Sequence, residues 1–222
     1  MITFLKNNQI PYKEHIPLSE FTGMNQMGIL PLIVYPKKIK QLKTIYLKII
    51  NSKLSFDILG GITNTYLSNN YQRDIIIVTT KLKGIEKSDE TIWVECGYSL
   101  TKIARKLSSE GITGYEGFIG IPGTIGAAAI NNSGAFNSSI SNVVKKVRLL
   151  TPQGHTIDLN NTELKYTTRN SVLKKNLEKG IVLCVELDIT NKDTIENIQT
   201  KIKTVNTCLL YTSDAADDRI SV

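Results

Sequence analysis

The chain has 222 residues, of which 41% are hydrophobic and 21% charged. This is enough for one sizeable domain or two small subdomains that share a ligand, and it excludes a disordered chain. The net charge of +7 comes from scattered lysines, so it disfavours nucleic-acid binding and instead favours attraction of an acidic, phosphorylated substrate.

The cysteines and the start of the chain give no sign of export or metal binding. Cys96, Cys184 and Cys208 lack metal or redox spacing, and the first two fall in predicted strands, where a cysteine is usually a small core residue. The N-terminus has no long apolar core, and no apolar run approaches the length of a membrane span. We therefore expect a cytoplasmic protein with neither a membrane nor a nucleic-acid partner.

The first part of the chain predicts a small parallel α/β unit. Residues 1–20 have no clear pattern and are expected to be irregular. A short apolar strand at 32–34 is followed by apolar residues at helical spacing as far as residue 53. Strands are then predicted at 54–59 and 75–78, and the second is continuously apolar, as in a strand buried on both faces.

The second part predicts a mixed or antiparallel sheet with helices. Ser99 is expected to cap a helix over 100–107, with Gly111 just past its end. The remaining predicted elements are a strand at 92–96, a hairpin of 143–150 with 156–159, a strand at 181–189, and a helix from 195 with a capping box of Asp193 and Glu196.

Two glycine-rich turns are the candidate ligand site. Gly117, Gly120, Gly123 and Gly126 recur every third residue and precede a small-residue helix at 127–130. Such a turn can direct unpaired N–H groups at an anion, although a close-packed turn without a ligand is the alternative.

The other turn is Gly60-Gly61-Ile62-Thr63-Asn64, directly after a predicted strand. Neither turn matches a P-loop or the dinucleotide fingerprint of the Rossmann fold. Two separate backbone cradles suit a diphosphate, so we infer a cofactor whose pyrophosphate lies between two subdomains.

These motifs resemble those of the UDP-N-acetylenolpyruvoylglucosamine reductase family, also called UDP-N-acetylmuramate dehydrogenase, which has the flavin-binding fold shared with vanillyl-alcohol oxidase. The family's Leu-Gly-Gly-Gly-Ser-Asn corresponds to Leu59–Asn64, and its Gly-Ile-Pro-Gly-Thr-Ile-Gly-Gly corresponds to Gly120–Ala127. Its Met-Asn-Ala-Gly-Ala-Tyr corresponds to Asn131–Phe136, and the motif of its catalytic arginine to Thr168-Arg169-Asn170-Ser171.

The resemblance implies an α+β, two-subdomain FAD-binding fold with the flavin between a parallel α/β unit and a second, mixed or antiparallel sheet. It implies that NADPH reduces FAD, which then reduces the enolpyruvyl group of a UDP-sugar in peptidoglycan precursor synthesis. Arg169 is the candidate catalytic cation, because a guanidinium can hold a carboxylate with two donors. The implied cofactor-binding residues are Leu59, Gly60, Gly61, Ile62, Thr63, Asn64, Gly120, Ile121, Pro122, Gly123, Thr124, Gly126, Asn132 and Ala135.

Several positions depart from the family pattern. Thr168 replaces a tyrosine, Phe136 lacks the usual hydroxyl, and Ile62 and Ala127 stand where the family has glycine. The family's proton-donating serine and its glutamate partner find no counterpart in the chain. We therefore expect the chain alone to bind FAD weakly and not to turn over.

Covalent flavin attachment elsewhere in this fold uses a histidine or cysteine, but His155 falls in a hairpin turn and Cys96 in a strand, and His15 is the other histidine. We therefore expect FAD to be bound without a covalent bond.

The expected organisation is an N-terminal subdomain over 1–84, a second over 85–190, a linker helix over 191–207 and a non-native tail over 208–222. Residues 208–217 resemble the translation of a sequencing adapter. Two alternatives to the reductase are the flavin-binding half of another oxidoreductase of this fold, and a nucleotide-binding module without redox activity.

Overall fold

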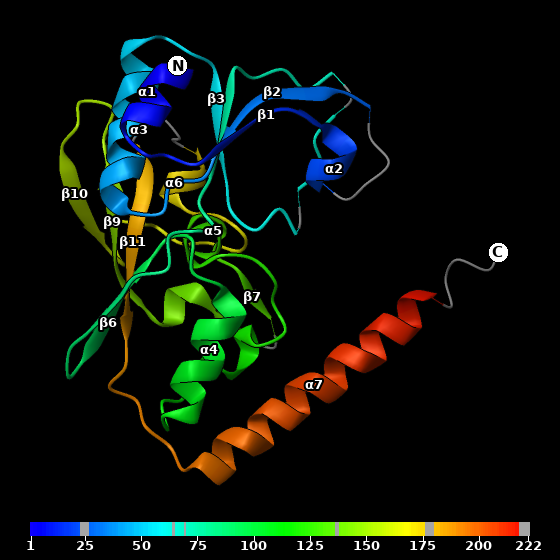
Figure 1. Cartoon of the computed structure of the whole chain (residues 1–222). Coiled ribbons are helices and arrows are strands. Elements are labelled where there is room, and N and C mark those ends of the chain that lie inside the picture. Colours follow the sequence, from blue (N-terminus) through cyan, green and yellow to red (C-terminus); the bar gives the residue numbers. More distant parts are fainter. Residues whose placement is uncertain (23–26, 64, 69, 136–137, 176–179, 218–222) are drawn as a thin grey trace.

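Two sheets and the helices around them make up the protein, as Figure 1 shows. The computed structural model describes residues 1–22, 27–63, 65–68, 70–135, 138–175 and 180–217. In chain order, the N-terminal elements are α1 (Ile2–Asn7), β1 (Tyr12–Pro17), α2 (Leu18–Thr22), β2 (Ile29–Val34), α3 (Ile39–Asn51), β3 (Phe56–Leu59) and β4 (Ile75–Val78).

The first sheet has the strand order β1-β2-β4-β3. Strands β2, β4 and β3 are parallel, and β1 is antiparallel to β2, so the parallel α/β unit predicted here is confirmed. All four residues of β4 are buried. Ile75 and Ile77 face the main core, whereas Ile76 and Val78 face a smaller apolar cluster on the other side of the sheet.

The second sheet is antiparallel and follows in the chain. Its strands have the order β10-β9-β11-β6-β5. The elements of this part are β5 (Ile85–Lys87), β6 (Thr91–Glu95), α4 (Leu100–Ser109), the 3₁₀ helix η1 (Glu116–Phe118), α5 (Ile125–Asn131), β7 (Gly134–Ala135), β8 (Ser138–Ser139), η2 (Ile140–Asn142), β9 (Val144–Leu150), β10 (Thr156–Asn160), α6 (Val172–Lys175), β11 (Ile181–Asp188) and α7 (Ile195–Asp217).

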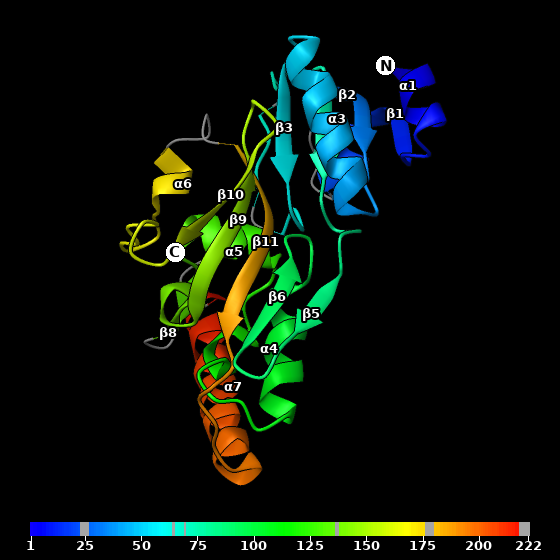
Figure 2. The same cartoon turned by 90° about the vertical axis from the view of Figure 1, so that its left-hand side faces the viewer.

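One apolar core joins the two sheets. It contains Val34 and Ile77 from the first sheet and Val94 and Val185 from the second, all 0% exposed. Figure 2 shows α4 and α5 beside the second sheet and α3 beside the first. Because the sheets share a core, they pack against each other as one unit.

The predicted start of α4 is confirmed. The Ser99 side chain accepts a hydrogen bond from the Lys102 N–H, and Gly111 has the left-handed φ of +78° just past the helix. The predicted hairpin of β9 and β10 is also present.

Two local predictions are wrong. Residues 1–20 are not irregular but form α1, β1 and the start of α2, and Leu5 of α1 is fully buried. The first helix is too short to show a helical period, and β1 is an edge strand with mostly exposed side chains. The capping box of Asp193 and Glu196 is also absent, because Thr194 caps α7 by accepting from the Asn197 N–H at 3.2 Å.

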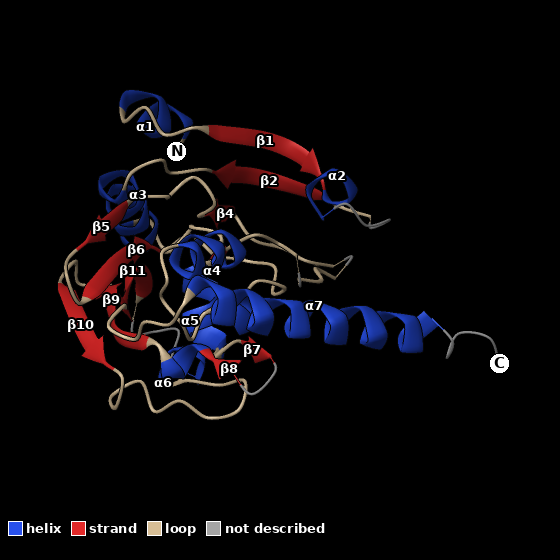
Figure 3. Ribbon diagram, turned by 90° about the horizontal axis from the view of Figure 1, so that it is seen from below, coloured by secondary structure: helices blue, strands red, loops and turns tan. Residues whose placement is uncertain are grey.

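Helix α7 begins beside α4 and then extends away from the two sheets (Figures 1 and 3). Its side chains Ile198 and Val205 are buried, and Ile202 is partly buried against the core. Among the described residues, none of the helices combines the length and the apolar character that a bilayer crossing requires.

A candidate cofactor site between two glycine turns

The first glycine turn leaves the end of β3 and contacts the second turn directly. A Cβ atom added to Gly60 would lie 2.4 Å from the Thr124 Oγ1, and one added to Gly61 would lie 3.4 Å from the Gly123 Cα. Glycine is therefore needed at position 60 for the two turns to approach this closely. Residues about sixty positions apart thus meet, as the sequence predicted.

The second glycine turn connects η1 to α5. Gly123 has a φ of +120°, which L-residues other than glycine rarely adopt. Thr124 caps α5, and its Oγ1 accepts from the Ala127 N–H at 3.4 Å.

The N–H groups at the start of α5 are not free for an anion. The Ile125 N–H donates to the Tyr98 carbonyl and the Gly126 N–H donates to the Cys96 carbonyl. The expectation that the first turn of this helix presents unpaired donors is therefore wrong.

The glycines in the turns themselves present free backbone donors. Within the described chain, no residue accepts a hydrogen bond from the N–H of Gly60, Gly61, Gly120 or Gly123. All four glycines line the same cavity, and unpaired backbone N–H groups in such loops can form a concave anion site. The donors for an anion are therefore in the loops and not in the helix.

Both turns line one cavity of about 900 Å³. This is large enough for an extended cofactor. Among the described residues that line it, Arg169 and Lys174 are charged and none is acidic, so the cavity favours an anion. The predicted site residues that line it are Gly60, Gly61, Ile62, Thr63, Gly120, Ile121, Pro122, Gly123, Thr124, Ala135 and Arg169.

Three other predicted site residues lie elsewhere, and a fourth is outside the described residues. Leu59 and Gly126 line a neighbouring, mostly apolar cavity of about 230 Å³, which shares Gly60 and Thr124 with the first. Asn132 is not among the residues that line either cavity. Asn64 is the residue that the structure does not describe.

Asn132 holds the loop that carries Arg169. It is 8% exposed, its Nδ2 donates to the Thr167 carbonyl at 2.9 Å, and its Oδ1 accepts from the Ser141 N–H at 3.1 Å. The Ser171 Oγ donates to the Ile130 carbonyl at 2.6 Å. These bonds fix both ends of the Arg169 loop to the end of α5 and the residues after it.

Arg169 lies at the tip of a two-residue turn at the cavity. Thr167 and Asn170 exchange two backbone hydrogen bonds of 3.1 Å, and Arg169 between them has a φ of +55°. The Arg169 side chain is exposed, and no described residue makes a hydrogen bond or ion pair with its guanidinium. The guanidinium is thus available to an anionic ligand.

Lys174 is a cavity residue that the sequence interpretation missed. Its Nζ donates to the Arg169 carbonyl at 3.1 Å, and its side chain lines the cavity beside Arg169. It lies five positions after the arginine in a short helix, and the motif alone gave no reason to select it.

The histidines and cysteines with described side chains are not part of the main cavity. His15 and His155 are exposed and line neither of these cavities. Cys96 lines the smaller cavity, and burial raises the pKa of its thiol, so it is a poor nucleophile. In the described part of the chain, no group of three or more histidine, cysteine, aspartate or glutamate residues could hold a metal ion.

A sequence profile of the FAD binding domain family matches residues 30–160. The chain therefore belongs to the FAD-binding-domain family. The cavity fits this assignment, since its opposed glycine turns offer free N–H groups and its charged lining residues are cationic.

The curated relatives include UDP-N-acetylenolpyruvoylglucosamine reductases. The enzyme of Caldicellulosiruptor bescii is 32% identical over 180 residues, which are 81% of this chain and 57% of the relative. That of Bacillus pumilus is 34% identical over 171 residues, 77% of this chain and 56% of the relative. These relatives confirm the resemblance predicted from the motifs, and the chain spans a little over half of their length.

Solved structures confirm the fold. The UDP-N-acetylenolpyruvylglucosamine reductase of Thermus caldophilus superposes with a TM-score of 0.73 at 20% identity, covering 90% of this chain and 69% of that chain. An alkyldihydroxyacetonephosphate synthase superposes with a TM-score of 0.54 at 17% identity, covering 74% of this chain and 32% of that chain. The predicted α+β fold, with a parallel unit and a second antiparallel sheet, is therefore confirmed.

Proposed function

We propose that the chain is the FAD-binding part of a UDP-N-acetylenolpyruvoylglucosamine reductase, a cytoplasmic enzyme of peptidoglycan precursor synthesis. The single observation that carries the proposal is the cavity itself, where two turns with free N–H groups face each other beside Arg169. Gly60, Gly61, Gly120 and Gly123 would hold the diphosphate of FAD by their N–H groups.

FAD, when bound, supplies hydride transfer from NADPH to the enolpyruvyl double bond of the UDP-sugar. The chain's own part is to orient the reactants and to stabilise charge. Addition of hydride to the double bond increases negative charge on the adjoining carboxylate, and the Arg169 guanidinium would stabilise it with two donors. Lys174 would add a second positive charge at the same mouth of the cavity.

The organisation of the chain follows the two sheets. Residues 1–84 and 85–190 would each form one side of the cofactor site, and 191–207 would lead towards a substrate-binding region. We propose that the 222-residue chain by itself does not turn over, since it spans a little over half of the length of its curated relatives. The last fifteen residues would be non-native.

The first test is a titration of the purified chain with FAD, followed by flavin absorbance and fluorescence. We expect saturable binding, with flavin released into the supernatant on acid precipitation because no covalent bond is formed. A chain that stays colourless and does not change the flavin spectrum would favour a nucleotide-binding module without redox activity.

A second experiment tests which substrate the whole protein reduces. The genomic reading frame past codon 207 can be sequenced, expressed as one chain and assayed with NADPH and the enolpyruvyl UDP-sugar. We expect reduction of the substrate, and a loss of at least about 100-fold in kcat/KM in Arg169→Met with FAD binding retained. An oxidoreductase that binds FAD and leaves this substrate unreduced would support another member of the fold.

A further inference from the structure

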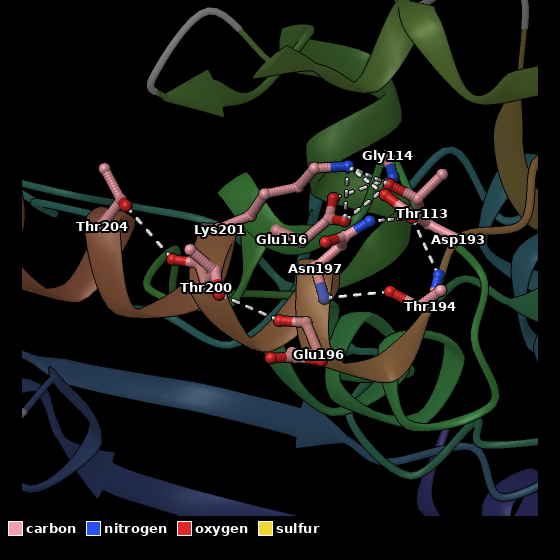
Figure 4. Close-up of polar contacts among 10 residues, drawn as sticks. All are labelled: Thr113, Gly114, Glu116, Asp193, Thr194, Glu196, Asn197, Thr200, Lys201 and Thr204. Carbon is pink, nitrogen blue, oxygen red and sulfur yellow. Dashed lines mark hydrogen bonds and ion pairs between the residues drawn. The ribbon is translucent and has the colours of Figure 1, made fainter.

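Glu116 is a buried carboxylate that lies outside both cavities. Its side chain is 8% exposed. Its Oε1 accepts from the Thr113 Oγ1 at 2.7 Å and its Oε2 accepts from the Gly114 N–H at 2.8 Å (Figure 4). A buried carboxylate needs such partners, so these bonds hold the Thr113–Gly114 turn against the start of η1.

The helix η1 touches two walls of the cofactor cavity. It ends at Phe118, which is fully buried, and the Ile121 N–H of the second glycine turn donates to the Phe118 carbonyl at 3.0 Å. A Cβ atom added to Gly117 would lie 2.7 Å from the Ser138 Oγ and 3.1 Å from the Ala135 carbonyl oxygen. A shift of η1 would therefore move the second glycine turn and press on the strand that carries Ala135.

Lys201 of α7 completes the network around Glu116. Its Nζ donates to the Asp193 Oδ2 at 2.8 Å and to the Thr113 Oγ1 at 3.0 Å, and it lies 4.0 Å from the Glu116 Oε1 (Figure 4). The Thr113 hydroxyl can accept from Lys201 and donate to Glu116 at the same time. A continuous path of contacts thus leads from α7 to the carboxylate.

The backbone supports the same connection. The Thr113 N–H donates to the Asn191 carbonyl at 3.1 Å, and the Asp193 N–H donates to the Gly111 carbonyl at 3.0 Å. The segment that enters α7 and the segment that enters η1 therefore pair with each other. They are expected to move together.

We propose that Lys201 and Glu116 are positioning residues through which α7 sets the position of the second glycine turn. This inference rests on the proposed function, because that turn is one half of the proposed FAD site. A chain segment joined to residues 195–207 of α7 would then act on cofactor binding through Lys201. When α7 is docked, the second glycine turn has the geometry that binds FAD. Release of α7 weakens FAD binding.

The test uses two single variants of the full chain, Lys201→Met and Glu116→Gln. The matched controls are Lys203→Met and Glu196→Gln, which remove the same charges from exposed positions of α7. Amide hydrogen exchange is measured without FAD at Phe118, Ile119 and Ile121, whose N–H groups bond within the η1 segment. We expect exchange to be at least about 5-fold faster in the two test variants and unchanged in the controls.

Amides of β6 and β11 show whether the effect is local. Their exchange should stay the same in every variant, and Lys201→Arg should restore slow exchange in η1. Equal acceleration in η1 and in β11 would mean general loss of stability and would overturn the proposal, as would no change in η1.

A parallel FAD titration separates this inference from the proposed function. We expect the Kd of Lys201→Met for FAD to rise by at least about 5-fold relative to Lys203→Met. An unsubstituted chain that does not bind FAD contradicts the proposed function, while the exchange measurement still decides the coupling. If the unsubstituted chain binds FAD and both test variants bind it with the same Kd, the proposed coupling through Lys201 and Glu116 is overturned and the proposed function is not.

Discussion

Thr124 lies in the second glycine turn and also contacts the first, which the sequence did not predict. Its Oγ1 caps α5, and the same atom occupies the space where Gly60 would carry a Cβ. Gly60 and Thr124 are therefore coupled residues at the point where the two halves of the site meet.

Gly60→Ala is expected to destabilise the chain by about 1–3 kcal/mol, because the new methyl group would overlap the Thr124 Oγ1. The effect can be measured by urea unfolding. In a Thr124→Ala background the same change should cost clearly less, since the overlapping atom is gone. Equal costs in the two backgrounds would show that the turns are not in contact.

Ile62 differs from the family pattern in a way that the sequence shows but does not explain. It stands where the related family has glycine, and its φ is +60°. A β-branched residue in this region costs roughly 1–3 kcal/mol. The backbone thus keeps the conformation that suits glycine, and Ile62 still lines the cavity.

At the scale of elements, the sequence predicted strands and helices best where an apolar pattern was long or complete. The continuously apolar β4 and the capped helix α4 are examples. It failed at α1 and β1, because a six-residue helix and an exposed edge strand carry little periodic signal. It also placed the cap of α7 one residue too early, since Asp193 and Thr194 are both good capping residues.

Asp193 has another role at the start of α7. Hydrogen bonds from Lys201, then from Asn197 and the Thr194 N–H, lower the pKa of Asp193 to about 2. The same hydrogen bond between Lys201 and Asp193 raises the pKa of Lys201. A lowered carboxyl pKa stabilises the folded arrangement above the unfolded pKa of about 4 and loses this effect as pH falls towards the folded value.

We therefore expect the start of α7 to loosen between about pH 4 and pH 2. The exchange protection factor of the Ile198 amide, which bonds to the Thr194 carbonyl, should fall more steeply over this range than the protection factors of the β11 amides. Lys201 and Glu116 are the other charged groups of the network. Asp193→Asn should be loose already at neutral pH and lack this part of the pH dependence; a variant with the same pH profile as the unsubstituted chain would rule out Asp193 as the cause.

At the scale of the whole molecule, the sequence predicted that the two turns meet but not how. The motifs identified most of the cavity lining. They could not show that Asn132 holds the Arg169 loop, that Lys174 faces the cavity, or that the α5 N–H groups are already bonded. These features depend on contacts between distant segments, which a local pattern does not encode.

In the proposed cofactor site the two turns bind a single diphosphate, and amide chemical shifts test this directly. The ¹⁵N-labelled chain is titrated with FAD, and in parallel with ADP, which carries a diphosphate without the flavin. We predict that the amide signals of Gly60 and Gly61 move together with those of Gly120 and Gly123, along one binding curve. Flavin binding that moves the signals of only one turn, or of neither, would show that the two turns do not share the diphosphate.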